Sequence, residues 1–392
     1  MELNKVVIHY SEIAIKGGNR KHFENLLMKN IQKAVGKFMN GGEQRYGKII
    51  LNIKDLDESG KGELISSLQK VPGIVSFCIG VSASLDFESI KERVLALVKQ
   101  AGDFGTFRIS TKRGNKKFSM SSPQINEELG GLILDNFGSS RVKLKGADLE
   151  VFVEIGELEA HIYTSSEKYL GVGGLPVGSG GRVVVSLSGG LDSPVAAYMV
   201  MKRGLEVVYV HVHNSTVGGG RVKDKIKELT KILSSYQPLK SKLYIIPFDK
   251  LQQEVIMNVP SALRMIVYRR IMMRLLNEVA VKVKASGIVT GDSFGQVASQ
   301  TLENQLCIRD ASILPVFSPL IGMNKEEIIR VARDIGTFDT SILPGEDCCS
   351  FMIAKNPETK AKLAEIKKHE DKITNMDSLV EQAIKESEII HI

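Results

Sequence analysis

Several residue types are scarce in this chain of 392 residues. It contains no tryptophan, 11 prolines and 4 cysteines, and aromatic residues make up 6%. So few cysteines do not form a disulfide scaffold, so we expect reduced thiols and a cytoplasmic protein. No apolar run approaches the roughly 18 residues of a membrane span. The charged residues 1–5 lack a secretory apolar core. We therefore expect no membrane segment and no leader.

The composition does provide apolar material and an excess of positive charge. Hydrophobic residues make up 43%, which is ample for buried cores, and the length suggests two or three domains. The formal net charge is +7, which permits a polyanionic partner without requiring one, because many basic proteins bind no nucleic acid.

The most informative motif is the segment Ser188–Ser193, which reads Ser-Gly-Gly-Leu-Asp-Ser. It follows the apolar run 183–187 and precedes another that begins at Val195, so a strand, a tight turn and a helix are predicted. Such a turn directs backbone N–H groups and the helix dipole toward one point, and its glycines allow an anion to approach closely. Ser193 is expected to cap the helix. The motif therefore predicts a phosphate-binding loop.

The loop is not of the kinase type, because the pattern G-x-x-x-x-G-K-[ST] is absent from the sequence. It resembles instead the loop of the PP-loop ATP pyrophosphatases, which cleave ATP between the α and β phosphates and adenylate a substrate. A glycine turn with only a structural role is the alternative.

Hydrophobic periodicity divides the chain into three regions, expected at 1–75, 76–170 and 171–392. The order β-α-β-(β)-α-β in the first predicts a small ferredoxin-like module, and the second reads as another small α+β module. A glycine-rich linker candidate lies at 171–181, and strands and helices alternate after it. That alternation predicts an α/β domain whose parallel sheet has helices on both faces and binds its ligand beyond the carboxyl ends of the strands. The strands are expected at 183–187, 206–212, 243–248, 286–290 and 313–317, and the helices at 193–203, 221–235, 249–257, 261–284, 324–335 and 357–369.

Three more polar segments follow predicted strands and could join the loop around one pocket. In the first, His211–Asn214, a single His-x-His is weak evidence for zinc, so backbone contact with a nucleotide base is favoured. The second is the glycine-containing segment Thr290–Thr301, as expected of a ligand-lining loop. In the third, Lys325 begins a helix that Asn324 can cap. A lysine there opposes the helix dipole unless a phosphate lies nearby, and a solvated lysine is the alternative.

The cysteines differ in their surroundings. Cys78 lies in an apolar run and is expected to be buried and inert, whereas Cys348 and Cys349 lie in a polar, turn-like segment. An accessible thiol of that kind suits a nucleophilic or sulfur-carrying role, with Cys307 as a candidate resolving thiol. No C-x-x-C pair is present, so a zinc knuckle is not expected.

Basic residues gather in three groups in the N-terminal half of the chain. Each group alone could be a solvated face, but together, beside an adenylating domain, they favour RNA binding. The residues expected to contact RNA are Lys16, Arg20, Lys21, Lys112, Arg113, Lys116, Lys117 and Lys143.

Over essentially its whole length the chain resembles the tRNA 4-thiouridine synthetases, the ThiI family. The resemblance rests on Tyr10–Arg20, Ser188–Ser193, Thr290–Thr301, the helix start at Lys325 and Glu346–Cys349. It implies a ferredoxin-like domain, a THUMP domain and a PP-loop domain. It also implies that ATP adenylates O4 of uridine 8 in tRNA with release of pyrophosphate, and that sulfur then replaces AMP at C4.

The resemblance further implies a role for each motif residue. Asp192 and Lys325 would support adenylation, and Cys348 would be the catalytic cysteine, with Cys349 or Cys307 as the resolving thiol. Mg²⁺ would neutralise the phosphates, with no metal site of the protein's own. ATP would be bound by Ser186, Leu187, Ser188, Gly189, Gly190, Ser193, His211, Val212, Arg269, Gly291 and Gln300.

The sulfur route is less constrained. Some family members carry a C-terminal rhodanese domain, to which the family's link with thiamine synthesis is largely tied, whereas this sequence ends 43 residues after Cys349. Sulfur is therefore expected from a cysteine desulfurase or another persulfide or sulfide donor, with transfer of a persulfide directly onto Cys348 as the route considered. An iron–sulfur cluster is not favoured without a C-x-x-C pair. The resemblance suggests a homodimer. An adenylating ligase or amidotransferase acting on a small molecule, and an RNA-binding module that senses ATP, are the alternatives.

Overall fold

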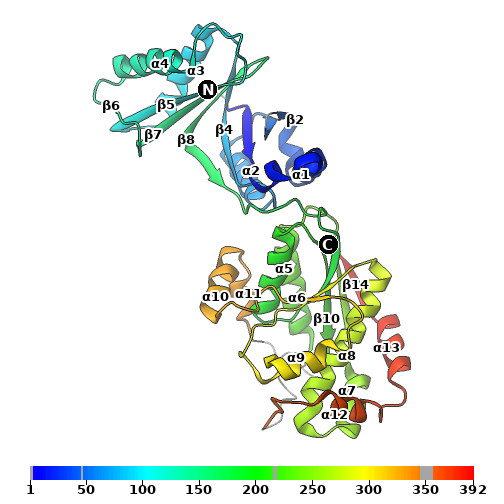
Figure 1. Ribbon diagram of the computed structural model, residues 1–392. Helices are drawn as coiled ribbons and strands as arrows, with labels where there is room; N and C mark the ends of the chain where they lie inside the picture. The colour runs from blue at the N-terminus through cyan, green and yellow to red at the C-terminus, as the bar shows by residue number, and fades with distance from the viewer. Residues whose placement is uncertain (1–2, 46, 215–218, 345–355) are drawn as a thin grey trace. The chain divides into compact units, whose positions relative to one another are not determined.

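The structure is a computed structural model that describes residues 3–45, 47–214, 219–344 and 356–392 (Figure 1). The chain forms two compact units, residues 1–174 and 175–392, and each is described by itself. Among the described residues, no helix combines the length and the apolar character needed to cross a membrane.

The first unit contains one continuous eight-stranded sheet, with the strand order β2-β3-β1-β4-β8-β7-β5-β6. Strand β4 pairs antiparallel with β1 on one side and with β8 on the other, so it belongs to both halves of the unit. The boundary expected at residue 75 falls just before this shared strand and stays a prediction. The strands are β1 (Lys5–His9), β2 (Met39–Arg45), β3 (Lys48–Ile53), β4 (Ser76–Ala83), β5 (Thr106–Arg113), β6 (Arg141–Val142), β7 (Leu149–Ile155) and β8 (Ala160–Leu170).

Four α-helices pack against this sheet, two in each half. The apolar spacing of the sequence predicts a helix over Phe87–Gln100, and α3 has these bounds. Asp86 caps it by accepting a hydrogen bond from the Ser89 N–H at 2.7 Å. The helices are α1 (Arg20–Val35), α2 (Glu58–Gln69), α3 (Phe87–Gln100) and α4 (Ser122–Asn136).

The sequence Asn40–Gly42 predicts the end of the first long helix, whereas the structure places these residues in strand β2. These residues pair with β3, and the register shifts between Met39 and Gly41. Glycine is a poor strand former, but it is tolerated at such a bulge, and the pairing with β3 outweighs the local preference.

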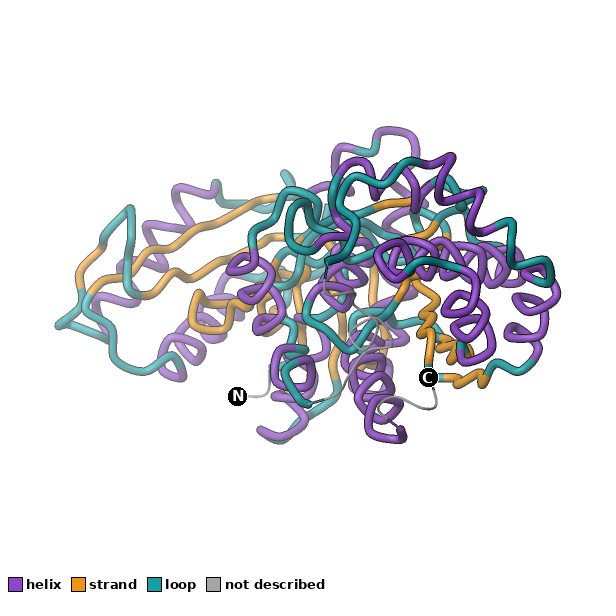
Figure 2. The backbone as a smooth tube through the Cα atoms, turned by 90° about the horizontal axis from the view of Figure 1, so that it is seen from below, coloured by secondary structure: helices purple, strands orange, loops and turns teal. Residues whose placement is uncertain are grey.

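The second unit contains a six-stranded sheet, with the order β13-β12-β9-β10-β11-β14. Strands β13 to β11 run parallel, and helices cover both faces (Figures 1 and 2), as the alternating pattern predicts. The strands are β9 (Arg182–Ser186), β10 (Glu206–His213), β11 (Lys242–Pro247), β12 (Ile288–Val289), β13 (Val316–Phe317) and β14 (Glu388–His391). The helices are α5 (Asp192–Lys202), α6 (Gly219–Ser234), α7 (Asp249–Asn258), α8 (Ser261–Val283), α9 (Leu302–Arg309), α10 (Lys325–Asp334), α11 (Phe338–Ser341), α12 (Leu363–Glu370) and α13 (Met376–Lys385).

Four of these elements were not expected from the sequence: α9, α11, α13 and β14. Helix α9 has eight residues, too few for a clear periodic signal. Strand β14 has four residues and pairs antiparallel with β11 at the sheet edge, an arrangement set by tertiary contact. Helix α12 begins at Leu363, later than the expected 357, after the proline at 357.

Candidate nucleotide site and basic surface

A cavity of about 550 Å³ lies at the carboxyl ends of β9, β10 and β12, the edge where a parallel sheet binds ligands. Its lining contains ten of the residues predicted to contact ATP or to support adenylation, namely Ser186, Leu187, Ser188, Asp192, Ser193, His211, Val212, Arg269, Gly291 and Gln300. Gly189 and Gly190 belong to the same loop without lining the cavity. The fold thus brings four distant sequence segments to one place.

The loop 188–193 closes on itself through Ser193. The Ser193 Oγ accepts a hydrogen bond from the Ser188 N–H at 2.8 Å, and the Gly190 N–H donates to the Ser188 Oγ at 3.3 Å. The expectation that Ser193 caps the helix is wrong. Helix α5 begins one residue earlier, its N-cap is Leu191, and no side chain caps it. The hydroxyl of Ser193 therefore shapes the loop instead.

Gly291 lets the segment after β12 approach the start of α5. A Cβ at this position would lie 2.7 Å from the Ser193 N and 2.9 Å from the Asp192 carbonyl carbon. Those separations are too short for any side chain, so glycine is required for the close backbone packing that forms this wall of the cavity.

Asp192 and Lys325 form an ion pair at the mouth of the loop. The Lys325 Nζ lies 2.6 Å from the Asp192 Oδ1, and the two side chains are 43% and 25% exposed. Lys325 is the first residue of α10, which Asn324 caps as expected by accepting a hydrogen bond from the Glu327 N–H at 3.0 Å. The Asp192 carboxylate offsets the unfavourable position of a lysine at a helix start.

The sequence did not identify Asp292, a buried residue of the cavity wall that is 4% exposed. The Arg269 guanidinium donates to the Asp292 Oδ1 at 2.7 Å and to the Ser299 Oγ at 3.2 Å. Thr290 and Gln300 donate to the same carboxylate. Burial by itself would raise the pKa of Asp292, but the Arg269 charge and these hydrogen bonds outweigh it and lower the pKa. The ionised carboxylate therefore fixes Arg269 at the cavity.

The His211 side chain lies next to the start of the phosphate loop. Its Nδ1 lies 2.9 Å from the Leu187 carbonyl oxygen, which fixes the imidazole plane against β9. The neighbouring His213 ring is 5.9 Å away between centroids. Burial, together with the nearby His211 and Lys223, lowers the pKa of His213 to about 4, so it is neutral at pH 7. The neutral His213 ring therefore adds no charge beside His211.

Lys225 is a second residue that the sequence did not single out. It lies on α6 and is buried, and its Nζ donates to the Ser341 carbonyl at 2.9 Å and to the Leu343 carbonyl at 2.8 Å. The same Nζ would lie 3.5 Å from a Cβ at Gly189. A buried ammonium group thus contacts the glycine turn that the motif assigns to phosphates.

We expect the Lys225→Met variant to bind ATP about tenfold more weakly, because the substitution removes a charge beside the phosphate loop and leaves two carbonyls unpaired. Isothermal titration of the purified variant measures this change. Lys231→Met, which removes an exposed lysine of the same helix, is the matched control. Equal ATP affinity in the Lys225→Met and Lys231→Met variants would contradict the expectation, and a melting curve excludes misfolding as the cause.

A second cavity, of about 530 Å³, lies in the first unit and is predominantly basic. Its lining contains two of the predicted RNA-binding residues, Lys112 and Arg113. It also contains two basic residues that were not predicted to bind RNA, Arg45 and Lys48. Lys48 forms an ion pair with Glu154, which also lines the cavity. The fold therefore concentrates charge that is dispersed in the sequence.

Five of the eight predicted RNA-binding residues have exposed side chains, namely Lys21, Lys112, Lys116, Lys117 and Lys143.

Two arginines of the set also hold the fold together. Arg20 donates to Glu24 at 2.9 Å and to the Tyr10 hydroxyl at 3.2 Å. Arg113 donates to the carbonyls of Phe118 and Met120 at 3.1 and 2.7 Å. Lys16 is half-buried, with its Nζ 5.2 Å from the ring centroid of Phe23. Substitution of either arginine would therefore change folding stability as well as any RNA binding. The exposed lysines are better suited to test RNA binding alone.

His9 in the second cavity makes the stability of the first unit depend on pH. Burial, with the charges of Lys48, Lys112 and Lys168, lowers its pKa from 6.5 to about 4. Below pH 6.5 the unfolded chain takes up a proton that the folded chain does not, so stability is lost as the pH falls toward 4. We expect a loss of about 1–2 kcal/mol from this residue, measured by urea denaturation across that range. The loss of stability on lowering the pH should be smaller in His9→Asn than in the control variant His22→Asn, which keeps His9. Equal pH dependence of stability in the two variants would contradict the assignment to His9.

Comparison with known proteins agrees with this architecture along the whole chain. The family model described as "Thiamine biosynthesis protein (ThiI)" matches residues 178–375, the ThiI ferredoxin-like domain matches 5–78, and the THUMP domain matches 85–165. A probable tRNA sulfurtransferase of Acetivibrio thermocellus is 42% identical, over 99% of this chain and 98% of its own length. One of Clostridium perfringens is 39% identical, over 98% of each chain.

Solved structures match in the same way. The crystal structure of a 4-thiouridine synthetase–RNA complex with bound ATP superposes with a TM-score of 0.92 at 35% identity, covering 100% of both chains. The crystal structure of PH1313 from Pyrococcus horikoshii has a TM-score of 0.67 at 26% identity, covering 85% of this chain and 100% of that one.

Proposed function

Since the chain belongs to the ThiI family of tRNA sulfurtransferases, we propose that its second unit holds ATP in the 550 Å³ cavity and adenylates a uridine of tRNA. The enzyme is an ATP-dependent tRNA sulfurtransferase that forms 4-thiouridine. The observation that carries the site assignment is the Asp192–Lys325 pair, 2.6 Å apart, at the start of α5 beside that cavity.

The α5 N-terminus and the loop 188–193 supply the phosphate site. Backbone N–H groups and the helix dipole attract the phosphates, and Lys325 adds a positive charge where the α-phosphate is attacked. Mg²⁺ would be held mainly by the ATP oxygens, and the partly exposed Asp192 carboxylate is the oxygen ligand that the loop offers. When bound, the ion neutralises phosphate charge. Arg269, fixed by Asp292, and His211 line the part of the cavity left for the nucleoside.

The chemistry then has two steps. In the first, O4 of the uridine, at position 8 in the family's tRNA, attacks the α-phosphate, and the bond to pyrophosphate breaks. In the second, the terminal sulfur of a persulfide on Cys348 attacks C4, and AMP leaves. A resolving thiolate then attacks the Cys348 sulfur, which releases 4-thiouridine and leaves a disulfide that an external thiol reduces.

The described cysteines favour Cys349 as the resolving thiol. Cys348 and Cys349 lie outside the described residues. Cys307 is buried, its Sγ lies 3.4 Å from the Ala361 carbonyl, and burial raises the pKa of its thiol. A raised pKa lowers the thiolate fraction that the step needs. Cys78 is also buried, so few described thiols are suited to hold an iron–sulfur cluster. We therefore propose a persulfide route, in which a cysteine desulfurase or another persulfide donor transfers its outer sulfur to the Cys348 thiol and is released as a thiol.

The reaction is tested with the full chain, ATP, Mg²⁺, unmodified tRNA and inorganic sulfide. We expect 4-thiouridine, followed by its near-ultraviolet absorbance, together with AMP and pyrophosphate. AMP formation that does not depend on tRNA would favour an adenylating ligase of a small molecule. Binding of tRNA without any AMP would favour a non-catalytic module.

We propose that the exposed lysines of the first unit bind the tRNA backbone. Replacing Lys112, Lys116 and Lys117 together with glutamine should weaken tRNA binding and flatten its salt dependence, because each phosphate contact contributes about 0.7–0.9 to the slope of log K against log salt. Filter binding at several salt concentrations measures both. Replacing Lys29, Lys33 and Lys99, exposed residues of the same unit, removes equal charge as the control. If both triple variants lose affinity equally, net charge and not this surface determines binding.

A further inference from the structure

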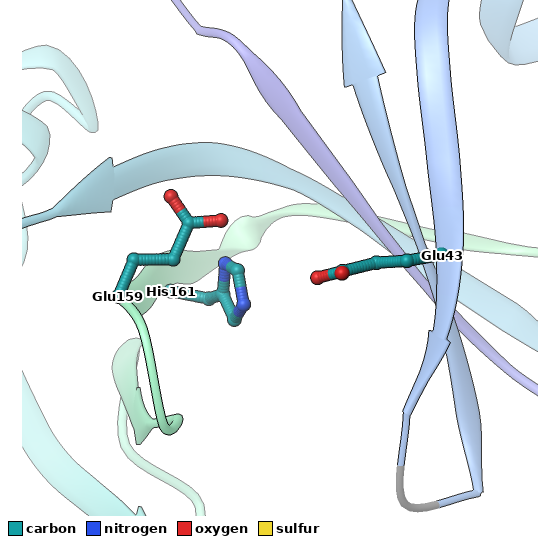
Figure 3. Close-up of side chains that lie close together, drawn as sticks. All are labelled: Glu43, Glu159 and His161. Atoms are coloured by element: carbon teal, nitrogen blue, oxygen red, sulfur yellow. The ribbon is translucent and has the colours of Figure 1, made fainter.

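Three side chains of the metal-binding types converge in the first unit, outside the nucleotide cavity. They are Glu43 on β2, Glu159 just before β8 and His161 on β8, and one ligand atom of each lies within 4.8 Å of the others. Figure 3 shows the His161 imidazole standing between the carboxylates of Glu159 and Glu43. We propose that Glu43, Glu159 and His161 bind one divalent transition-metal ion, with zinc as the best match.

The state of His161 is the independent observation that points to a ligand. The side chain is 2% exposed, and within the described part of the chain its buried Nδ1 has no hydrogen-bond partner. Leaving a buried polar atom unpaired is unfavourable, so native structures rarely do it. A metal ion held by this side chain would give the ring a polar partner and explain why an imidazole is buried there between two carboxylates.

Each of the two carboxylates already forms an ion pair with a basic side chain. The Lys5 Nζ lies 2.6 Å from the Glu159 Oε1, and the Arg45 Nε lies 2.9 Å from the Glu43 Oε1. Partners of this kind orient metal ligands and hold each carboxylate through one oxygen, so that the other can face the ion. They also balance the two negative charges, so the donor types and not the net charge decide which ion binds.

The donor set favours zinc over magnesium or calcium. Mg²⁺ and Ca²⁺ are bound almost entirely by oxygen, whereas an imidazole with two carboxylates is a familiar zinc set that leaves room for water. Ligand atoms bonded to one zinc ion lie about 3–4 Å apart, so the triad needs only small side-chain adjustments.

A metal ion here would connect parts of the unit that are distant in sequence. Glu43 and Glu159 are separated by more than a hundred residues and belong to different halves of the first unit, with Glu43 on β2 and Glu159 just before β8. A link that closes so long a segment is stabilising, because the unfolded chain cannot form it. Saturating zinc should therefore raise the melting midpoint of the protein by about 5 °C at a hundredfold excess over Kd.

The test uses the full chain, stripped with a chelator and free of ATP, with Co²⁺ as the spectroscopic probe and Zn²⁺ as the competitor. Visible Co²⁺ bands without near-ultraviolet sulfur charge-transfer bands distinguish this nitrogen and oxygen site from cysteine ligation. We expect micromolar binding that zinc displaces, weakened about tenfold or more in Glu43→Gln, Glu159→Gln and His161→Asn. Replacing the buried His161 can impair folding, whereas Glu43 is only half-buried. Weaker Co²⁺ binding in Glu43→Gln would therefore be caused by the loss of a ligand and not by misfolding.

Matched controls come from the same unit. Glu63→Gln removes a carboxylate that pairs with Lys37, and His22→Asn removes an exposed imidazole, so both should bind Co²⁺ as the parent does. The proposal is overturned if the parent shows no such spectrum in the micromolar range, or if the triad variants keep it. It does not depend on the sulfurtransferase assignment, because no substrate is present in the experiment.

Discussion

The Lys325→Met enzyme is expected to form AMP on tRNA at least about 100-fold more slowly than the parent, the effect of removing one electrostatic stabiliser from a transition state. Methionine keeps most of the side-chain length and loses the ammonium group that lies 2.6 Å from Asp192. Charge develops on the α-phosphate during attack by the uridine oxygen, so a fixed positive charge there counts for more in the transition state than in bound ATP. ATP affinity should therefore change by only a few fold.

Loss of stability does not explain such a result. The Asp192–Lys325 pair is partly exposed, and a pair of this kind contributes about 0–1 kcal/mol to folding. Arg330→Met, which removes an exposed cation from the same helix, is the control and should keep parental rates. Lys325→Arg should retain part of the activity. Parental AMP formation by Lys325→Met in a single-turnover assay would remove Lys325 from the adenylation step.

The second large effect is expected for Cys348→Ala. With a persulfide donor this variant should form no measurable 4-thiouridine, because in the proposed relay the sulfur atom that attacks C4 is carried on the missing thiol. Binding of tRNA and the release of pyrophosphate should remain, because ATP and the uridine oxygen react before the sulfur is needed. Parallel assays of pyrophosphate and of 4-thiouridine separate the two steps in one preparation.

The other cysteines supply the comparison. Cys307→Ala changes a buried thiol and should keep multiple turnover, whereas Cys349→Ala should stop after one turnover. If Cys307→Ala stops after one turnover instead, Cys307 is the resolving thiol and the favoured assignment of Cys349 is wrong. Full activity of Cys348→Ala with a persulfide donor would contradict the sulfur relay itself.

The sequence predicts those parts of the molecule whose signals are local. The strand, glycine turn and helix around Ser188–Ser193 follow from apolar runs and turn chemistry, and the bounds of α3 follow from periodicity and the Asp86 cap. The alternation after residue 182 predicts the parallel sheet, and that sheet in turn predicts the edge at which Ser186, His211 and Gly291 meet.

What the sequence does not predict depends on contacts between distant residues. Arg269 lies off the apolar stripe of α8, and nothing nearby indicates that it pairs with Asp292, 23 positions later. Lys225 is one of several lysines on α6, and only the fold places it beside Gly189. Glycines in β2 indicate a turn until the partner strand is known. In each case a tertiary contact determines which of several locally possible structures the chain adopts.

If the exposed lysines of the first unit bind tRNA as proposed, the shared strand β4 limits how they can do so. Its two halves cannot swing apart without breaking the backbone ladder between β4 and β8, which extends over most of both strands. The spacing between basic groups on the surface of the unit is therefore set in advance and does not adapt to the ligand. We therefore expect this surface to act as a template, which would accept RNA whose phosphates match its fixed distances and would select by backbone shape rather than by base sequence.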